Sequence, residues 1–486
     1  MEAEMEKMHK VLIMRCDNYD SNRIGALIKE GMEELNVVPT GRVLLKPNVV
    51  IAHPKVFPHA FTRKEFLDGA IWAAKERSKK VTEIAVGERS GITIPTRYAF
   101  KNAGYGEIIK KHKIKTYYFD EVKQVPIKIG NSHTLRNQIY VPQPVAQADF
   151  LINLPKFKAH PWCRLTLSLK NFIGIQDDRH RLVDHNLFLE QKIADLQAVI
   201  QPQFIAIDAI SAGQKMMLTP TPFPMGAIVM GTNSCAVDTV GCHMVHVDPK
   251  DLLHLKYASQ RGFGPMDLNE IEFSGDYPLA EVQAKTRQFE FCMEHIDSYF
   301  NEKSNLTCTV GTFPADHSPD YCWGGCPGAL QEAMHVFNGF NPNVNEEIKN
   351  VHYVVGQVEG PLNIEKGQKV IFVGDCTSWK GDINGQKVSI ESSYKPPCDT
   401  DEKKTKSNDM VLKTIQTLWR CFKQRNAAYV HAKGCPVSVG DHVHYISMLG
   451  KIKNVNFDPR MVIPLNIAYW KMRIQRALNR LLLYIA

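Results

Sequence analysis

The sequence has 486 residues, of which 44% are hydrophobic and 23% are charged, as in an ordinary globular protein. Because a single hydrophobic core stops growing near ~250–300 residues, this length predicts at least two domains. The net charge of +8 is mild, and no basic run carries interleaved aromatic residues, so nucleic acid is not an expected partner. The polar start MEAEMEKMHK lacks the apolar core of a signal peptide, and no stretch approaches the ~20 apolar residues of a membrane span. We therefore expect a cytoplasmic protein.

The first half alternates short apolar strands with amphipathic helices. Thr62, with Glu65 three residues later, matches a capping box at the start of the second helix. Short strands separated by helices favour a mostly parallel sheet with helices on both faces, so the predicted class is α/β with a doubly wound sheet. The predicted strands are 11–14, 43–45, 84–86, 150–154, 204–207 and 227–230, and the predicted helices are 23–35 and 63–76.

Polar and titratable side chains follow the strands of this predicted sheet. The densest stretch is ADFLINLPKFKAHPWCRLTLSLKNFIG, in which lysines and a histidine follow directly after an apolar strand. Ligands of open α/β sheets bind at the carboxyl ends of the strands, and clustered lysines favour a small anionic substrate, a carboxylate or a phosphate. The candidate substrate-binding residues are Lys46, Asn48, Arg89, Lys156, Lys158, Asn171 and Asp238, and the candidate catalytic residues are His160, Lys170, His185 and Asp208.

Seven blocks of this half occur in the order of a known family. LLKPNVV, TRKEFLDGAIWAAKE, ADFLINLPKFKAH, TLSLKNFIG, the later His185, FIAIDAI and NSCAVDTVG resemble the pattern of domain-of-unknown-function family 362. The resemblance covers about residues 11–275. Because that family has no single assigned reaction, the resemblance implies a fold rather than an activity.

The stretch ADFLINLPKFKAH, with the lysine and histidine that follow it, also resembles the lactate racemase family. Those enzymes carry a nickel-pincer cofactor and run hydride chemistry on 2-hydroxy acids. The resemblance implies a catalytic role for His160, attachment of the cofactor at Lys170 and nickel ligation by His185. The sequence departs from that family at residues 167–169, where a glycine-rich approach is absent, and at residues 87–89, where the second catalytic histidine is absent.

The twelve cysteines divide unevenly between the halves. Cys16, Cys163, Cys235 and Cys242 lie beside apolar residues and are predicted to be small buried hydrophobes. The other eight fall between Cys292 and Cys435, a concentration that in a cytosolic chain indicates metal ligation. The alternation of elements restarts here, with predicted strands at 353–355, 370–373 and 428–430, predicted helices at 328–337 and 410–422, and a predicted exposed loop at 398–408.

Four of these cysteines form a candidate metal site. Cys322 and Cys326 lie in CWGGCP, which predicts a tight turn, whereas Cys376 and Cys435 follow predicted strands. Four such thiolates suit a zinc ion or an iron–sulfur cube, and the Cys-x₃-Cys spacing favours a cluster. The order of motifs over about residues 308–450 resembles the cluster domain of hydrogenase and respiratory complex I small subunits, which implies a flavodoxin-like sheet that holds one [4Fe–4S] cluster. Cys308 and Cys398 are alternative ligands.

The predicted organisation has four parts. They are an α/β substrate domain at 1–275, a helical connector at 276–307, a smaller iron–sulfur α/β domain at 308–455 and a basic amphipathic helix at 456–486. We expect this helix to dock by one face, and contact with a membrane surface is the less favoured alternative.

The leading hypothesis is an iron–sulfur redox enzyme that acts on a small anionic substrate. One alternative is a hydroxy-acid racemase or isomerase with a nickel-pincer-type site and a structural cluster. The other is a non-enzymatic partner in electron transfer or cofactor assembly, which binds a redox protein. The sequence has no Gly-x-Gly-x-x-Gly or Walker-A motif, so nothing indicates NAD or ATP.

Overall fold

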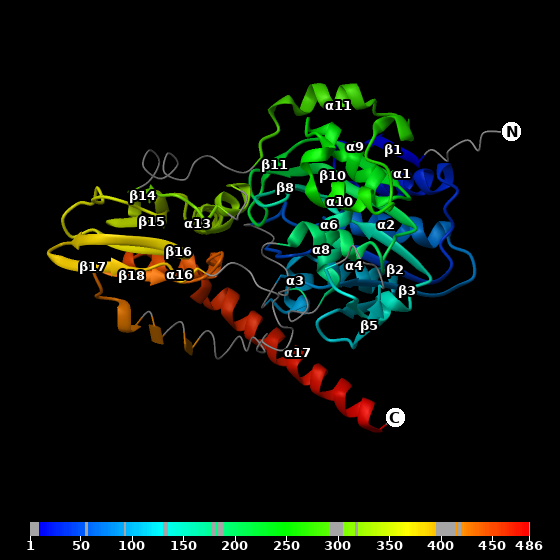
Figure 1. Cartoon of the computed structure of the whole chain (residues 1–486). Coiled ribbons are helices and arrows are strands. Elements are labelled where there is room, and N and C mark those ends of the chain that lie inside the picture. The colour runs from blue at the N-terminus through cyan, green and yellow to red at the C-terminus, as the bar shows by residue number, and fades with distance from the viewer. Residues whose placement is uncertain are drawn as a thin grey trace. The chain divides into compact units, whose positions relative to one another are not determined.

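The computed structural model describes residues 9–53, 57–91, 94–129, 135–176, 181, 188–291, 305–315, 319–394, 415–416, 419–420 and 422–485. The chain divides into two compact units. Unit 1 comprises Met1–Glu290 together with Leu465–Ala486, and unit 2 comprises Phe291–Pro464. Both units combine helices with a mostly parallel sheet, so the α/β prediction is confirmed (Figure 1).

Unit 1 is built on a sheet with the main order β13-β1-β12-β10-β7-β2-β3-β4. From β10 to β4 every neighbouring pair is parallel, whereas β12 runs antiparallel to both of its neighbours. β8 and β11 pair with β10, β9 pairs with β8, and β5 and β6 form a separate hairpin. The strands are β1 (His9–Arg15), β2 (Gly41–Pro47), β3 (Val81–Glu88), β4 (Lys115–Tyr118), β5 (Gln124–Lys128), β6 (Gln138–Pro142), β7 (Phe150–Leu154), β8 (Lys156–His160), β9 (Arg164–Thr166), β10 (Phe204–Gln214), β11 (Thr221–Phe223), β12 (Ala227–Gly231) and β13 (Ile271–Ser274).

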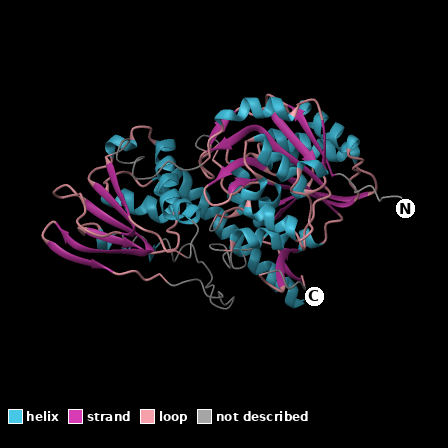
Figure 2. Cartoon of the chain, turned by 45° about the horizontal axis from the view of Figure 1, so that its top comes forward, coloured by secondary structure: helices cyan, strands magenta, loops and turns pink. Residues whose placement is uncertain are grey.

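Helices cover both faces of this sheet (Figure 2). Every residue of β7 and of β12 is buried, which requires cover on both sides because successive side chains point to opposite faces. The sheet is therefore doubly wound, as predicted. The helices are α1 (Ser21–Glu34), α2 (Lys64–Arg77), α3 (Thr96–Asn102), α4 (Tyr105–His112), α5 (Gln143–Ala146), α6 (Ser168–Asn171), α8 (Leu189–Leu196), α9 (Ser234–Met244), α10 (Leu253–Gln260) and α11 (Leu279–Lys285), with 3₁₀ turns η1 (Phe172–Ile175), η2 (Pro249–Asp251), η3 (Leu268–Glu270) and η4 (Thr286–Gln288).

The predicted capping box of α2 is wrong. The helix begins at Lys64 after Arg63, and no side chain caps it. Thr62 Oγ1 instead accepts a hydrogen bond from the Asn48 N–H at 2.9 Å and donates one to the Leu154 carbonyl at 2.7 Å. A buried hydroxyl that ties two strand ends together has replaced the expected local cap.

Unit 2 contains a five-stranded sheet in the described residues. Its parallel strands adjoin in the chain order β14-β15-β16-β18, which differs from the 2-1-3-4-5 order of flavodoxin. β17 pairs antiparallel with the second half of β16. The elements are β14 (Leu306–Val310), α13 (Pro319–Phe340), α14 (Val344–Glu347), β15 (Val351–Gln357), β16 (Lys369–Ile383), β17 (Gln386–Ile390), β18 (Tyr429–Ala432), α16 (Val439–Leu449) and η6 (Val455–Phe457).

The two faces of the unit 2 sheet are covered differently. Tyr353 and Val355 pack with residues of α13 and α16, whereas Val354 and Phe372 pack with Trp379 on the other face. Helices thus cover one face, and the β16–β17 hairpin covers the other. The predicted connector at 276–307 includes α11 and η4, whereas residues 292–304 and the predicted loop at 398–408 lie outside the described residues.

The last helix, α17 (Pro459–Ile485), begins in unit 2 and continues in unit 1. Among the residues that the structure describes, no helix has both the length and the apolar composition needed to cross a bilayer.

Candidate functional site

The first polar cluster lies where β2 and β3 end. Lys46 Nζ is 2.7 Å from Glu88 Oε2 and also donates to the Asn171 carbonyl at 2.7 Å. Burial lowers the pKa of Lys46 and raises that of Glu88, while their mutual attraction opposes both shifts. Because the carboxylate also accepts the Arg89 N–H at 2.7 Å, these contacts favour the charged pair. Lys46 therefore has an internal carboxylate partner.

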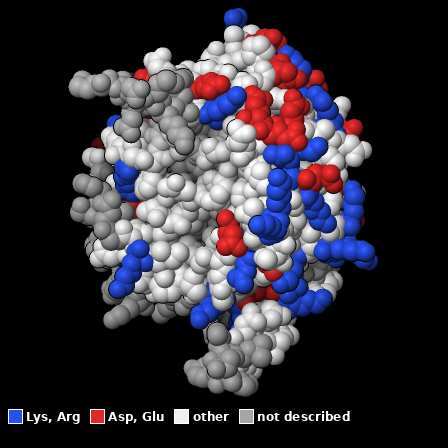
Figure 3. Space-filling model, turned by 90° about the vertical axis from the view of Figure 1, so that its right-hand side faces the viewer, with Lys and Arg blue, Asp and Glu red and all other residues white. Residues whose placement is uncertain are grey.

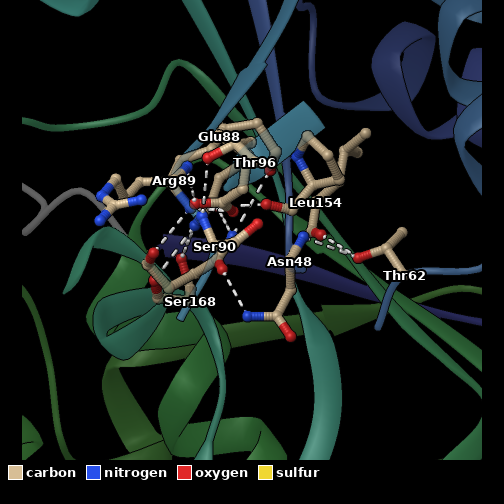
Figure 4. Close-up of polar contacts among 12 residues, drawn as sticks. Asn48, Thr62, Glu88, Arg89, Ser90, Thr96, Leu154 and Ser168 are labelled. Carbon is tan, nitrogen blue, oxygen red and sulfur yellow. Dashed lines mark hydrogen bonds and ion pairs between the residues drawn. The ribbon is translucent and has the colours of Figure 1, made fainter. Parts of the chain in front are cut away.

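The ends of β2 and β7 are tied to α6 by amide side chains. Asn48 Nδ2 donates to Asn171 Oδ1 at 3.0 Å, and Asn171 Nδ2 donates to Asn153 Oδ1 at 2.7 Å. Figure 4 shows Asn48 beside Thr62 and the Leu154 carbonyl. Asn48 Oδ1 is buried and has no hydrogen-bond partner among the described residues, so this atom is available to a donor of a bound molecule.

The loop after β3 carries Arg89 and Ser90 (Figure 4). Arg89 NH1 is 3.3 Å from Asp120 Oδ2, which also accepts the Thr96 N–H at 2.9 Å. Arg181 donates to the carbonyls of Ser90 and Arg89 at 2.6 and 3.1 Å. The guanidinium of Arg89, which was expected to bind substrate, is therefore engaged by a carboxylate of the protein.

A second cluster surrounds Asp208 on β10. Lys156 Nζ lies 3.0 Å from Asp208 Oδ2, and both side chains are fully buried. Tyr19 links the two, because its hydroxyl accepts from Lys156 Nζ and donates to Asp208 Oδ1, each at 2.8 Å. The Arg63 N–H donates to Asp208 Oδ2 at 3.1 Å. Asp208 thus neutralises a buried lysine and tethers the start of α2.

Lys158, two residues further along β8, has carbonyl partners. Its Nζ donates to the Ala60 oxygen at 2.8 Å and to the Met217 oxygen at 3.3 Å. The sequence assigned the counter-charge of these lysines to a substrate. In the structure, Glu88 supplies it for Lys46 and Asp208 supplies it for Lys156.

The third cluster pairs two candidate catalytic residues, Lys170 on α6 and His160 at the end of β8. Their Nζ and Nε2 atoms are 2.7 Å apart. His160 Nδ1 accepts the backbone N–H groups of Trp162 and Cys163 at 3.0 and 3.3 Å, so the ring proton of the imidazole is carried by Nε2. Nε2 can then only donate to Lys170, which must accept as a neutral amine. Burial also lowers the pKa of Lys170.

Three further side chains lie around this amine, of which Cys163 and His254 are buried and Glu190 is partly exposed. Lys170 Nζ donates to Cys163 Sγ at 3.7 Å, and that thiol is 3.7 Å from Glu190 Oε1. Burial raises the pKa of Cys163 to about 12, so it remains a thiol. Burial, together with any charge on Lys170, lowers the pKa of His254 to about 3. Neither ring nitrogen of His254 has a hydrogen-bond partner among the described residues.

Asp238 on α9 positions this cluster rather than joining it. Its two carboxylate oxygens accept the backbone N–H groups of Ser168 and Leu169 at 2.7 and 3.0 Å. Burial raises the pKa of Asp238 to about 8, and the two hydrogen bonds oppose that shift. Held in this way, α6 presents Lys170 and Asn171 at adjacent positions. His185 lies outside the described residues.

The cysteine motif of unit 2 differs from its predicted local structure. Cys322 and Cys326 lie within α13, not in a tight turn, and residues four apart share one face of a helix. Cys376 lies inside β16 rather than at its end, because the strand continues past Gly374 to pair with β17. Cys435 follows β18, as predicted.

Two of these thiols, one from α13 and one from β16, lie close to Gly374. A Cβ built on this glycine would lie 3.3 Å from Cys326 Sγ and 3.7 Å from Cys376 Sγ, and its φ of +98° disfavours other residues. Burial raises the pKa of the Cys326 thiol, and three neighbouring thiols raise it further. These thiols belong to Cys376, Cys435 and Cys322.

The four thiols are neighbours, but they do not have the geometry of a metal site. In the described parts of the chain, no three His, Cys, Asp or Glu side chains are arranged to hold a metal ion. Cys308, an alternative ligand, is buried in the core between the sheet and α13, and Cys398 lies outside the described residues.

Residues 43–243 match the family model of a domain of unknown function, DUF362. The thylakoid-associated protein sll1697 of Synechocystis sp. is 22% identical over 284 residues, which cover 55% of this chain and 84% of that protein. The solved structure of the lactate racemase apoprotein from Thermoanaerobacterium thermosaccharolyticum aligns with 74% of this chain and 71% of its own, at 11% identity and a TM-score of 0.32.

The matched segment contains Lys46, Lys156 and Lys170, whereas Tyr19 and His254, which belong to their clusters, lie outside it. Sequence reasoning missed several of the partners. The sequence analysis selected Arg89 as a site residue, but it did not select the adjacent Glu88, whose carboxylate pairs with Lys46. Cys163 was assigned to the core, and it is buried as predicted, yet it also contacts Lys170. The partners Tyr19, Asp120, Glu190 and His254 had no local signal in the sequence.

Proposed function

We propose that the chain is an iron–sulfur oxidoreductase in which unit 2 binds one [4Fe–4S] cluster and the DUF362 domain binds a small anionic substrate. The proposed cluster ligands are Cys322, Cys326, Cys376 and Cys435. The observation that carries the proposal is the approach of thiols from a helix and a strand to Gly374, where no side chain fills the space between them. When bound, the cluster would supply one-electron transfer.

The arrangement of the thiols favours a cluster over a zinc ion. Four ligands of zinc surround one atom at about 2.3 Å, whereas the iron and sulfide atoms of a cube lie between its four thiolates. Thiols that come from a helix and a strand and leave the space at Gly374 free of side chains agree with a cube. In addition, the Val437 N–H donates to Cys326 Sγ at 3.4 Å, and such bonds stabilise cluster thiolates.

Metal analysis of the full chain, purified without oxygen, tests this proposal. We expect a brown protein with iron and acid-labile sulfide in equal amounts. Cys376→Ser should lose both, whereas Cys235→Ser, at a buried thiol of α9 in unit 1, should retain both. A colourless protein with one zinc ion per chain would contradict the proposal.

The substrate half of the proposal concerns the edge that follows β2 and β7. Lys46, Lys156 and Lys158 lie there together with Glu88 and Asp208, and an edge at which three buried lysines gather would attract a small anion. Thermal-shift titration with 2-hydroxy carboxylates and inorganic phosphate should give stabilisation that weakens with salt. If Lys158→Met binds the best anion as tightly as the natural protein, the site lies elsewhere.

One observation favours a second candidate, a hydroxy-acid racemase or isomerase. The neutral amine of Lys170, held by His160, fits covalent attachment of a nickel-pincer-type cofactor better than ion pairing. Nickel analysis and intact mass distinguish the candidates. Added mass that maps to Lys170, together with nickel, would support the racemase. Lys170 recovered without modification, and no nickel, would leave the redox enzyme as the proposal.

A further inference from the structure

One face of α17 is bound to unit 1. Ala468, Tyr469 and Met472 are buried, with 8%, 4% and 6% of their surfaces exposed. Further along the helix, Arg476 Nε donates to the Asp120 carbonyl, and Asn479 Nδ2 donates to the Glu121 carbonyl at 2.7 Å. The helix is therefore fixed to the loop after β4 by its buried face.

The opposite face of α17 is an exposed apolar stripe. At 100° per residue, the centre of the stripe lies about 160° around the helix from Met472. Its members recur every three or four residues, so they form one continuous band. They are Ile467, Trp470, Ile474, Leu478 and Leu481, with 53%, 54%, 58%, 48% and 57% of their surfaces exposed.

The charge around the stripe has one sign. Residues 459–486 contain five basic residues and no acidic residue. Lys471 and Arg473 are exposed and lie on opposite sides of the stripe at the helical angle. Figure 3 shows blue lysine and arginine side chains above the white atoms near the lower end of the molecule, where α17 lies in Figure 1.

The positive charge indicates which partner would cover the apolar stripe, a second copy of the chain or a membrane surface. Two copies of the chain that paired by this stripe would bring Lys471 and Arg473 of both helices together, and residues 459–486 contain no carboxylate to offset them. Coiled-coil pairing instead uses opposite charges beside the seam. An apolar face that contains a tryptophan and is flanked by lysine and arginine fits the surface of a membrane with anionic lipids.

The same composition recurs in unit 2. Ile415, Trp419 and Phe422 follow one another at spacings of four and three, and 57–60% of their surfaces are exposed. The ammonium of Lys423 lies 5.2 Å from the centre of the Trp419 ring, and the guanidinium of Arg425 lies 3.9 Å from that of Phe422. Residues 410–426 contain four basic residues and no acidic residue. Two separate segments thus have exposed apolar residues, including a tryptophan, beside cations.

We propose that α17 is an interfacial helix that lies on the surface of an anionic lipid bilayer. Trp470 and its apolar neighbours insert at the level of the headgroups, while Lys471 and Arg473 bind lipid phosphates. Binding of this kind needs no spanning segment. The face that contacts unit 1 stays in place, so the membrane holds unit 1 by a helix that is already folded. This inference does not depend on the proposed redox activity.

Flotation of the full chain with vesicles tests the inference. We expect binding to phosphatidylcholine vesicles that contain phosphatidylglycerol, weaker binding in high salt and little binding to phosphatidylcholine alone. The double variant Trp470→Glu, Ile474→Glu should bind at least about tenfold more weakly, because it removes two inserted apolar side chains. Leu253→Glu, at an exposed apolar position of α10, is the matched control and should bind normally.

Circular dichroism and thermal melting check that each variant is folded, since all three positions are exposed. Equal binding to vesicles with and without anionic lipid would overturn the electrostatic part of the inference. No binding to either, or a dimer in solution that the double variant dissociates, would overturn the membrane as the occupant of the stripe.

Discussion

Replacing Asp208 by asparagine keeps the shape of the side chain and removes the charge that neutralises Lys156. Both side chains are fully buried, and their charged atoms are 3.0 Å apart. The carboxylate also accepts hydrogen bonds from the Tyr19 hydroxyl and the Arg63 N–H. An asparagine presents an NH₂ donor on one side, so one of these donors then faces another donor.

The expected loss of unfolding free energy is about 3–5 kcal/mol, the usual effect of removing one partner from a buried ion pair. Solvent does not screen this pair, because neither side chain is exposed. Burial already lowers the pKa of Lys156. Without Asp208, the unfolded chain binds a proton at Lys156 that the folded chain resists. The stability of Asp208→Asn should therefore recover as pH rises toward the ordinary lysine pKa of 10.5.

Urea denaturation of the full chain, followed by circular dichroism, measures this effect. Lys156→Met combined with Asp208→Asn should be more stable than Asp208→Asn alone, because no buried charge then remains unpaired. Asp251→Asn is the control, since its partner Arg164 lies at the same 3.0 Å but both side chains are about half exposed. That change should alter stability by less than about 1 kcal/mol. Equal losses for Asp208→Asn and Asp251→Asn would refute the reasoning.

Two other predictions concern the same unit. His254 has a pKa of about 3 when folded against 6.5 when unfolded, so its contribution is complete above pH 6.5 and declines as pH falls toward 3. Between pH 7 and pH 5, protonation of His254 in the unfolded chain should cost about 2 kcal/mol of unfolding free energy. His254→Leu should remove this part of the pH dependence, which urea titration at both pH values measures. Gly174→Ala should cost about 1–3 kcal/mol, because its Cβ overlaps Glu88 Oε1 and lies 3.1 Å from Lys46 Nζ. Gly106→Ala, on α4 with nothing within 4 Å, should not destabilise the protein in the same assay.

Runs of apolar residues predicted most strands of the sheet, and strands that contain buried charged residues were missed. β7 has the predicted bounds because its five residues are all buried and mostly apolar. β8, directly after it, was missed, because Lys156 and Lys158 give the segment KFKAH the appearance of an exposed loop. A lysine can be buried in a strand only when a partner from elsewhere in the chain compensates it. That partner is invisible to local pattern.

The same limit applies to the candidate site. Polar residues after β2 and β7 were found because they follow apolar strands, but their partners are distant in sequence. Tyr19 and Asp208 are 189 residues apart, and Lys46 and Glu88 are 42 apart. In unit 2, the two glycines of CWGGCP predicted a turn. Packing of α13 against α16 and the sheet outweighs that local preference, and the cysteines lie on a helix.

The most direct test of the iron–sulfur proposal is iron K-edge X-ray absorption on the full chain, purified without oxygen. The proposal predicts iron surrounded by sulfur alone, with a second iron as its next neighbour, and loss of this signal in Cys326→Ser. Iron bound by nitrogen or oxygen ligands, or a sample that holds only zinc, would contradict a [4Fe–4S] cluster on these four cysteines.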